Sequence, residues 1–166
     1  MSSTSMLIDG VPLVIRPIRA DDSAALRAMH RGFTERTIYQ RFLGLHPDLS
    51  PTEADYFTHV DGVGRFALVA EDPAGALVAV ARYDRLPPDW RSAEVAFVVA
   101  DAYQHHGLGT ALVSMLREHA REAGVQCFVA DVLTTNLAMQ HAFNDAGLCA
   151  SSTRDHGVAH LEMPIL

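Results

Sequence analysis

Long hydrophobic runs are missing from this 166-residue sequence: the longest uninterrupted apolar stretches are 76–81 and 95–100, with six residues each. A helix that crosses a membrane needs about 20 consecutive apolar residues. The opening residues 1–5 carry no basic side chain and lead into no long apolar stretch, so a secretory signal is not expected either. These absences predict a cytoplasmic protein with no membrane partner.

Cysteine and basic charge are also scarce. The two cysteines, Cys127 and Cys149, lack C-x-x-C spacing and lie in apolar surroundings, which suits a reducing compartment, and we expect both to be small core residues. The net charge is −7 without any basic cluster, whereas binding to a phosphate backbone depends on arrays of Lys and Arg. Nucleic acid is therefore not expected as a partner, while the acidic balance favours a cationic substrate.

The length of 166 residues and the composition are those of a folded protein with one hydrophobic core. We find no internal repeat, no low-complexity tract and no Ser/Gly linker. The sequence therefore predicts a single domain over 13–166, preceded by a tail or an edge strand over 1–12.

Helical spacing of apolar positions predicts four to five helices. The clearest start signal is at Ser50, because Pro51 follows it and Glu53 stands where a capping box requires an acidic side chain. The expected helices begin at Asp21 or Asp22 and at Pro51, and cover 35–43, 107–123 and 137–146.

Short stretches rich in Val, Ala and Phe predict the strands. They are expected over 13–18, 65–71, 76–85, 94–100, 125–133, 148–154 and 158–165. This order of elements predicts an α+β fold in which a mixed central sheet of about seven strands is flanked by the helices.

A glycine-rich segment, Gln104 to Thr110, lies between the apolar strand and the most regular helix. Gly107 and Gly109 let the backbone approach a ligand closely, and the free N–H groups and positive dipole end of the helix favour an anion such as pyrophosphate. Taken alone, such a glycine pair is more often a tight turn. No Lys-Ser/Thr pair follows the glycines, so a nucleotide triphosphate P-loop is excluded, and a dinucleotide-binding unit is lacking too.

Two linked motifs carry a resemblance to a known family. The pattern Gln104-x-x-Gly107-x-Gly109 after an apolar strand resembles the acetyl-CoA signature of the GNAT N-acetyltransferases. Asn136 followed by Phe143-x-x-x-Gly147-Leu148 is similar to that family's Asn to Tyr-x-x-x-Gly-Phe segment. Two motifs in the family's order are more specific than either alone. The resemblance covers roughly 13–165 and implies the GNAT fold, acetyl-CoA as co-substrate and no metal.

The resemblance also implies roles for individual residues. The backbone of Phe97, Val98 and Val99 would hydrogen-bond the pantetheine arm, and Asn136 would contact pantetheine or simply cap the following helix. The pyrophosphate would be held by Gln104, His105, His106, Gly107, Leu108, Gly109 and Thr110.

Phe143 stands among the cofactor-binding positions where many family members have a Tyr that is thought to protonate the leaving thiolate. That general acid is absent here. A thiol has a pKa of about 8.5, so the thiolate can leave unaided or be protonated by water.

Glu94 is the predicted general base, because this carboxylate begins an otherwise apolar strand close to the expected thioester. A lysine amine with a pKa of about 10.4 must lose a proton before it attacks, at a cost of about 4–5 kcal/mol at neutral pH. The alternative is a strand-end Glu that forms an ion pair with Arg82 or Arg91.

The segments 92–96 and 36–42 resemble the bacterial protein lysine acetyltransferases that modify acyl-CoA synthetases, in which the strand Glu is the proposed base. This resemblance implies a protein lysine as acceptor, such as one on an acyl-CoA synthetase, with the acceptor loops over 34–57 and 86–91. Two alternatives stay open: acetylation of a small-molecule amine or amino acid, and a non-catalytic acetyl-CoA-binding sensor. Monomer and homodimer are equally compatible with the sequence.

Overall fold

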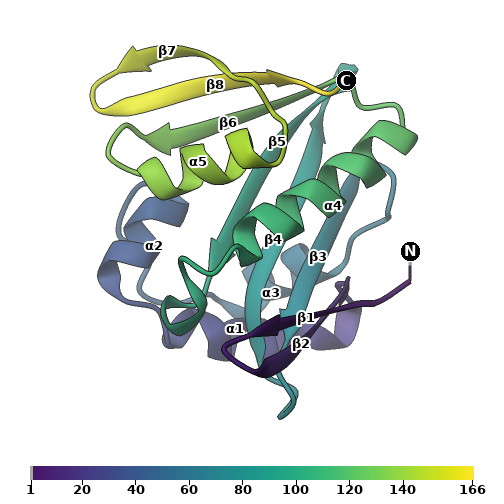
Figure 1. Cartoon of the computed structure of the whole chain (residues 1–166), viewed down its shortest axis with the longest axis vertical. Coiled ribbons are helices and arrows are strands. Elements are labelled where there is room, and N and C mark those ends of the chain that lie inside the picture. The colour runs from purple at the N-terminus through teal and green to yellow at the C-terminus, as the bar shows by residue number, and fades with distance from the viewer. Residues whose placement is uncertain (1) are drawn as a thin grey trace.

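The computed structural model describes residues 2–166, and their strands form one mixed sheet in the order β1-β2-β3-β4-β5-β6-β8-β7 (Figure 1). Neighbouring strands are antiparallel throughout except for β5 and β6, which are parallel. The strands are β1 Thr4–Ile8, β2 Val11–Pro17, β3 Arg65–Glu71, β4 Leu77–Leu86, β5 Asp89–Val99, β6 Cys127–Leu133, β7 Ser151–Asp155 and β8 Val158–Pro164.

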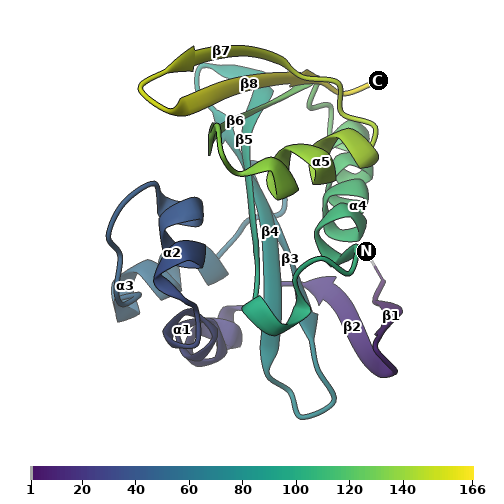
Figure 2. The same ribbon diagram turned by 60° about the vertical axis from the view of Figure 1, so that its left-hand side comes forward.

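Five α-helices cover the two faces of this sheet, α4 and α5 on one side and α1, α2 and α3 on the other (Figure 2). Two 3-10 turns, η1 and η2, lie before α1 and after β5. No helix within 2–166 has the length and apolar character needed to cross a bilayer. The bounds are η1 Ala20–Asp22, α1 Ser23–Arg31, α2 Glu35–Phe42, α3 Pro51–Thr58, η2 Asp101–Tyr103, α4 Leu108–Glu122 and α5 Leu137–Asp145.

The core has two parts because successive strand residues point to opposite faces of the sheet. Buried Ala81 belongs to the cluster under α4 and α5, together with Leu112 and Leu116. Its neighbour Val80 belongs to the cluster under α1 and α3, together with Leu26. The predicted α+β class is confirmed, with eight strands where about seven were expected.

The additional strand is β1, an edge strand antiparallel to β2. It lies in the range 1–12 for which a tail or an edge strand was expected, and Met1 of that range is outside the described residues. The capping box at α3 is confirmed: Ser50 Oγ accepts a hydrogen bond from Glu53 N (3.1 Å), and Glu53 Oε1 accepts one from Ser50 N (3.2 Å).

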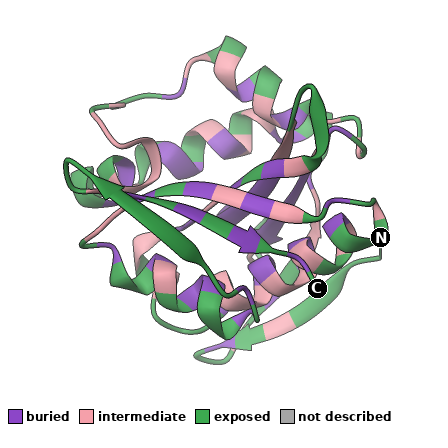
Figure 3. Cartoon of the chain, turned by 90° about the horizontal axis from the view of Figure 1, so that it is seen from above, coloured by how far each residue is buried: buried purple, intermediate pink, exposed green. Residues whose placement is uncertain are grey.

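One sequence-based expectation is made more precise and another is corrected. The segment 86–91, expected to be an acceptor loop, is the tight turn of the hairpin between β4 and β5, in which Leu86 already pairs with Asp89. The cysteines are not core residues: Cys127 is partly buried, and Cys149 is exposed in the connection from α5 to β7. Strand β7 is exposed along its whole length, so this end of the molecule offers no core for Cys149 (Figure 3).

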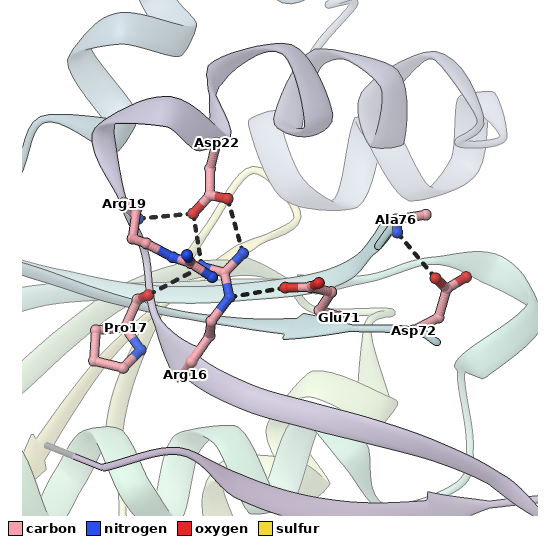
Figure 4. A network of polar contacts seen from close by, with 7 residues as sticks. All are labelled: Arg16, Pro17, Arg19, Asp22, Glu71, Asp72 and Ala76. Carbon is pink, nitrogen blue, oxygen red and sulfur yellow. Dashed lines mark hydrogen bonds and ion pairs between the residues drawn. The ribbon is translucent and has the colours of Figure 1, made fainter. Parts of the chain in front are cut away.

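A charged network joins the sheet to the first helical layer (Figure 4). Arg16 of β2 donates through Nη1 and Nη2 to the two carboxylate oxygens of Asp22, both at 2.8 Å, and through Nε to Glu71 Oε2 at 2.8 Å. Asp22 in turn accepts from Arg19 N at 2.7 Å. Burial raises the pKa of Asp22, but the hydrogen bonds from Arg16 and Arg19 outweigh it and hold that pKa below the ordinary value.

Candidate functional site

The sheet opens between β5 and β6. The two strands pair only from Ser92 with Cys127 to Glu94 with Val129, and β6 then continues beside β8 (Figure 1). Along 95–99, β5 has no strand partner on this edge. Backbone N–H and C=O groups in such a segment are free to bind an extended ligand in the manner of a strand.

A cavity of about 370 Å³ lies along the open edge, between β5, α2, the start of α4 and α5. Most of the positions that the sequence singled out for the cofactor line it. These are Phe97, Val98, Val99, Gln104, His105, Gly107, Gly109, Thr110 and Asn136.

The first turn of α4 is built to receive an anion. Gly107 caps the helix with φ 82° and has no side chain to satisfy the N–H groups, while His105 before it also has a left-handed φ of 64°. The first intrahelical hydrogen bond runs from Ala111 N to Gly107 O at 3.0 Å. The N–H groups of residues 108–110 therefore have no partner inside the helix, and they lie at its positive dipole end.

Gly109 has a packing role besides its place in the cavity lining. A Cβ atom at this position would lie 2.9 Å from Cε2 of Phe97, so the glycine lets α4 approach β5 closely. The Phe97 ring also meets the Phe143 ring edge to face, with centroids 5.6 Å apart. Phe143 is only 1% exposed and does not line the cavity. Its ring is therefore a core element.

Three more of the predicted residues lie outside the cavity lining. Leu108 is 1% exposed, so only its backbone is available to the anion site. His106 turns to the β1–β2 hairpin, with Nε2 3.0 Å from Asp9 Oδ2 and Nδ1 2.6 Å from Gln104 O. Glu94 lies on the exposed face of β5, at the point where the strands part.

Asn136 does cap the following helix, as the simpler expectation had it. Its Oδ1 accepts a hydrogen bond from Met139 N at 3.2 Å. The Nδ2 group has only Met139 Sδ at 3.7 Å, and sulfur is a weak acceptor. Because Asn136 also lines the cavity, this amide remains able to donate to a ligand.

The Gln104 side chain is held inside the protein. Its Nε2 donates to Thr37 Oγ1 at 3.1 Å and to Val99 O at 2.9 Å. The Val99 carbonyl, one of the groups expected to bind pantetheine, thus already has one hydrogen bond. Gln104 therefore links the glycine-rich loop to both β5 and α2.

Charged side chains gather where the strands part. Glu94 lies opposite Asp84 on β4, but Asp84 is bound by Arg82, whose Nη2 is 3.1 Å from Asp84 Oδ1. Within residues 2–166, Glu94 forms neither of the expected ion pairs, with Arg82 or with Arg91. Burial is the main effect that lowers the pKa of Arg41 to about 10; repulsion from Arg82 adds to it, and Glu94 opposes it.

About half of the cavity wall was not predicted to bind the cofactor. Two helical stripes supply most of it, on α2 and on α5, each with members three and four positions apart, which a search for helical faces could have found. The stripe on α2, Thr37, Gln40 and Arg41, lies in the segment 34–57 that was expected to form an acceptor loop. The residues outside both expectations are Tyr103, Ala138, Met139, His141, Ala142 and Asp145. In the described part of the chain, no group of three or more His, Cys, Asp or Glu side chains is placed to hold a metal ion.

Comparison with known proteins agrees with this geometry. Residues 27–148 match the family described as "Acetyltransferase (GNAT) family". Acetyltransferase Pat of Mycolicibacterium smegmatis is 38% identical over 118 residues, which are 69% of this chain and 34% of Pat. Acetyltransferase PA5475 of Pseudomonas aeruginosa is 31% identical over 137 residues, which are 81% of this chain and 73% of that protein.

Among solved structures, the GNAT domain of S. lividans PAT is similar with a TM-score of 0.88 and 34% identity. The match covers 98% of this chain and 96% of that domain. The alignment with Pat of M. smegmatis, in contrast, spans only about a third of that longer protein.

Proposed function

This chain belongs to the acetyltransferase (GNAT) family, and from that premise we propose that it is an N-acetyltransferase that transfers the acetyl group of acetyl-CoA directly to an amine, foremost a protein lysine. The observation that carries the proposal is the cavity between the unpaired edge of β5 and the start of α4, where no side chain caps the helix. One wall offers backbone groups for an extended amide chain, and the other offers an anion site.

Acetyl-CoA suits these two walls. Its pantetheine arm carries amide groups that match the free strand edge at Phe97 and Val98, and its pyrophosphate matches the N–H groups at the start of α4. The Nδ2 group of Asn136 is also available to donate a hydrogen bond to acetyl-CoA. Acetyl-CoA supplies an activated acetyl thioester, and the residues of this chain bind it and handle the proton.

Glu94 is proposed as the general base. It lies at the fork between β5 and β6, and its carboxylate carries no salt bridge among residues 2–166. The amine nitrogen forms a bond to the acetyl carbon, the carbon–sulfur bond breaks, and the amine proton passes to Glu94 directly or through one water. Removing that proton is useful because a lysine amine is almost fully protonated at neutral pH.

Protonation of the departing thiolate requires no residue at position 143. Phe143 has no ionisable group, and its ring is buried against Phe97. Because a thiol has a pKa of about 8.5, coenzyme A can leave as the thiolate and take its proton from water.

The lysine acceptor is supported by the resemblance of segments 92–96 and 36–42 to bacterial protein lysine acetyltransferases. The similarity to Pat and to the domain of S. lividans PAT points the same way. A cationic amine also suits the Glu94 carboxylate, which forms no salt bridge within residues 2–166.

The test is thiol release from acetyl-CoA, followed with a thiol-reactive dye, against a panel of folded proteins, lysine peptides, polyamines and amino acids. Release that requires a protein or peptide lysine, with acetyl-lysine found by mass spectrometry, supports the proposal. Release with small amines alone would mean that the acceptor is a small-molecule amine and not a protein lysine. Tight binding of acetyl-CoA in calorimetry, with no thiol release for any amine, would refute the proposed enzyme activity. It would support the alternative of a non-catalytic acetyl-CoA-binding sensor.

A further inference from the structure

Asp101, in the turn η2 directly after β5, collects hydrogen bonds from the start of α2. Its Oδ1 accepts from Thr34 Oγ1 at 2.8 Å and from Thr37 Oγ1 at 2.7 Å, and its Oδ2 accepts from Thr34 N at 3.2 Å. Burial raises the pKa of Asp101, but the hydrogen bonds from Thr37 and Thr34 outweigh it and keep that pKa below the ordinary value. The carboxylate is therefore ionised and acts only as an acceptor at neutral pH.

This fixes the direction of the neighbouring hydrogen bonds. Thr37 has one hydroxyl proton, and it goes to Asp101, so the Thr37 oxygen is left to accept from Gln104 Nε2 at 3.1 Å. The second proton of that amide goes to Val99 O at 2.9 Å. We call Asp101, Thr34, Thr37 and Gln104 the polar relay.

The polar relay joins two parts of the cavity that no other hydrogen bond connects within residues 2–166. Gln104 belongs to the glycine-rich loop that leads to the anion site. Thr37, 4% exposed, belongs to α2, and one turn later Gln40 and Arg41 complete the wall on the side of Glu94. The loop and that wall are therefore linked by an unbroken series of hydrogen bonds.

We propose that Asp101 is a positioning residue that couples the cofactor loop to α2, so that coenzyme A bound at the loop orders the acceptor side of the cavity. The functional part of this inference rests on the proposed acetyl transfer. It implies that α2 reaches its position for the amine only with the loop occupied.

The experiment measures amide hydrogen exchange by mass spectrometry on the full chain, with and without saturating coenzyme A. Thr37→Val removes the hydroxyl at nearly constant shape, and Thr37→Ser restores it. The matched control is Thr58→Val, because Thr58 is also a buried helical threonine, 2% exposed, but donates to Ala54 O in α3, away from the cavity.

In the parent, coenzyme A is expected to slow exchange in α2. In Thr37→Val this protection should disappear, while the Kd of coenzyme A changes by less than about threefold and the KM of the amine rises about three- to tenfold, the range expected for one lost hydrogen bond. Thr37→Ser and Thr58→Val should keep the protection. Asp101→Asn should weaken it, because an amide NH2 group in the place of Oδ2 cannot accept the hydrogen bond from Thr34 N.

Protection that persists in Thr37→Val would mean that coenzyme A contacts α2 directly, and this would overturn the relay. Equal loss in Thr58→Val would also overturn it, because the effect would then be general destabilisation. Since exchange is read with coenzyme A alone, an inactive parent would refute acetyl transfer without deciding the relay.

Discussion

Glu94 faces Val129 in the last pair of the parallel ladder between β5 and β6, and beyond this pair the two strands separate. Glu94 therefore lies where the gap between β5 and β6 begins, next to the part of the β5 backbone that has no strand partner. Strand pairing holds it on one side, through Val129, and on the other through Asp84 of β4. A base at this position needs no flexible loop to reach a ligand that lies along β5.

Replacement of this base tests the chemistry apart from binding. We expect Glu94→Gln to keep the Kd of acetyl-CoA and to lower turnover at neutral pH by about 100-fold or more, as is usual when a general base is lost. Raising the pH should partly restore the rate, because more of the amine is then already neutral. Calorimetry gives the Kd, and thiol release at pH 6–9 gives the rate.

The matched control for this variant is Glu162→Gln. Glu162 pairs with Val129 from the other side and is well exposed, so its replacement changes the net charge equally on the same face without touching the fork. We expect its turnover to stay within about twofold of the parent, as for an exposed charge away from the reaction. A similar fall in both variants would show that surface charge attracts the acceptor and that Glu94 is not the base.

A second prediction separates the two signature glycines. Gly109→Ala places Cβ 2.9 Å from Phe97 Cε2, so we expect a loss of about 1–3 kcal/mol of stability from overpacking, of which a Phe97→Leu background should recover a part. The Cβ atom of Gly107→Ala meets no atom within 4 Å, but the residue must keep φ 82°. The resulting loss of about 1–2 kcal/mol of stability should therefore be the same with and without Phe97→Leu. Urea unfolding of the parent, the three single variants and the two double variants measures both. Identical behaviour of the two glycines would refute the packing role of Gly109.

The parts of the fold that the sequence predicted are those with local causes. The start of α3 depends on Ser50 and Glu53, three positions apart, and both hydrogen bonds form as expected. The loop before α4 likewise follows from Gly107 and Gly109, two positions apart in the chain. The class and most element boundaries could be predicted for the same reason.

The missed parts depend on contacts between distant segments. Thr37 and Asp101 are 64 positions apart, and nothing in the sequence around either indicates that they meet. The role of Gly109 depends in the same way on the Phe97 ring of another element. The segment 86–91 was expected to be an acceptor loop, whereas strand pairing resumes at Asp89 and leaves only a tight turn between β4 and β5.

A third prediction concerns the network around Arg16. Arg16→Met would leave the Asp22 carboxylate, 6% exposed, without its cation, and breaking such a buried pair costs about 3 kcal/mol or more. The unfolding free energy of Arg16→Lys should fall between those of the parent and Arg16→Met. The lysine keeps the positive charge, but an ammonium cannot reproduce the forked contacts to Asp22 and Glu71. Urea unfolding at pH 7 gives the differences in free energy.

The pH dependence of these differences has a definite sign. The pKa of Asp22 is lowered in the folded chain, so its pairing with Arg16 contributes stability above the unfolded pKa of about 4, and this is lost as the pH falls through the folded value. The gap between the parent and Arg16→Met should therefore narrow in acid. A gap that stays constant down to pH 2 would show that lost packing of the Arg16 side chain, and not charge, accounts for the destabilisation.

His119 of α4 is packed in its neutral form against the sheet. Its ring is stacked on Phe66 with centroids 3.5 Å apart and an interplanar angle of 8°, and its Nδ1 lies 3.0 Å from the Tyr83 hydroxyl. Burial raises the pKa of Tyr83 to about 12, so this hydroxyl keeps its proton and is able to donate it to Nδ1. Burial also lowers the pKa of His119, and Glu122 offsets only part of that effect.

We therefore expect His119 to make the fold less stable in mild acid. Because its pKa is lower in the folded than in the unfolded chain, stability is complete above the unfolded value of about 6.5 and falls as the pH drops from there towards the folded value. His119→Gln cannot take up a proton, so its unfolding free energy should change less between pH 8 and pH 5 than that of the parent. Urea unfolding of both chains across this range is the measurement, and parallel curves would show that His119 titrates equally in the folded and unfolded states.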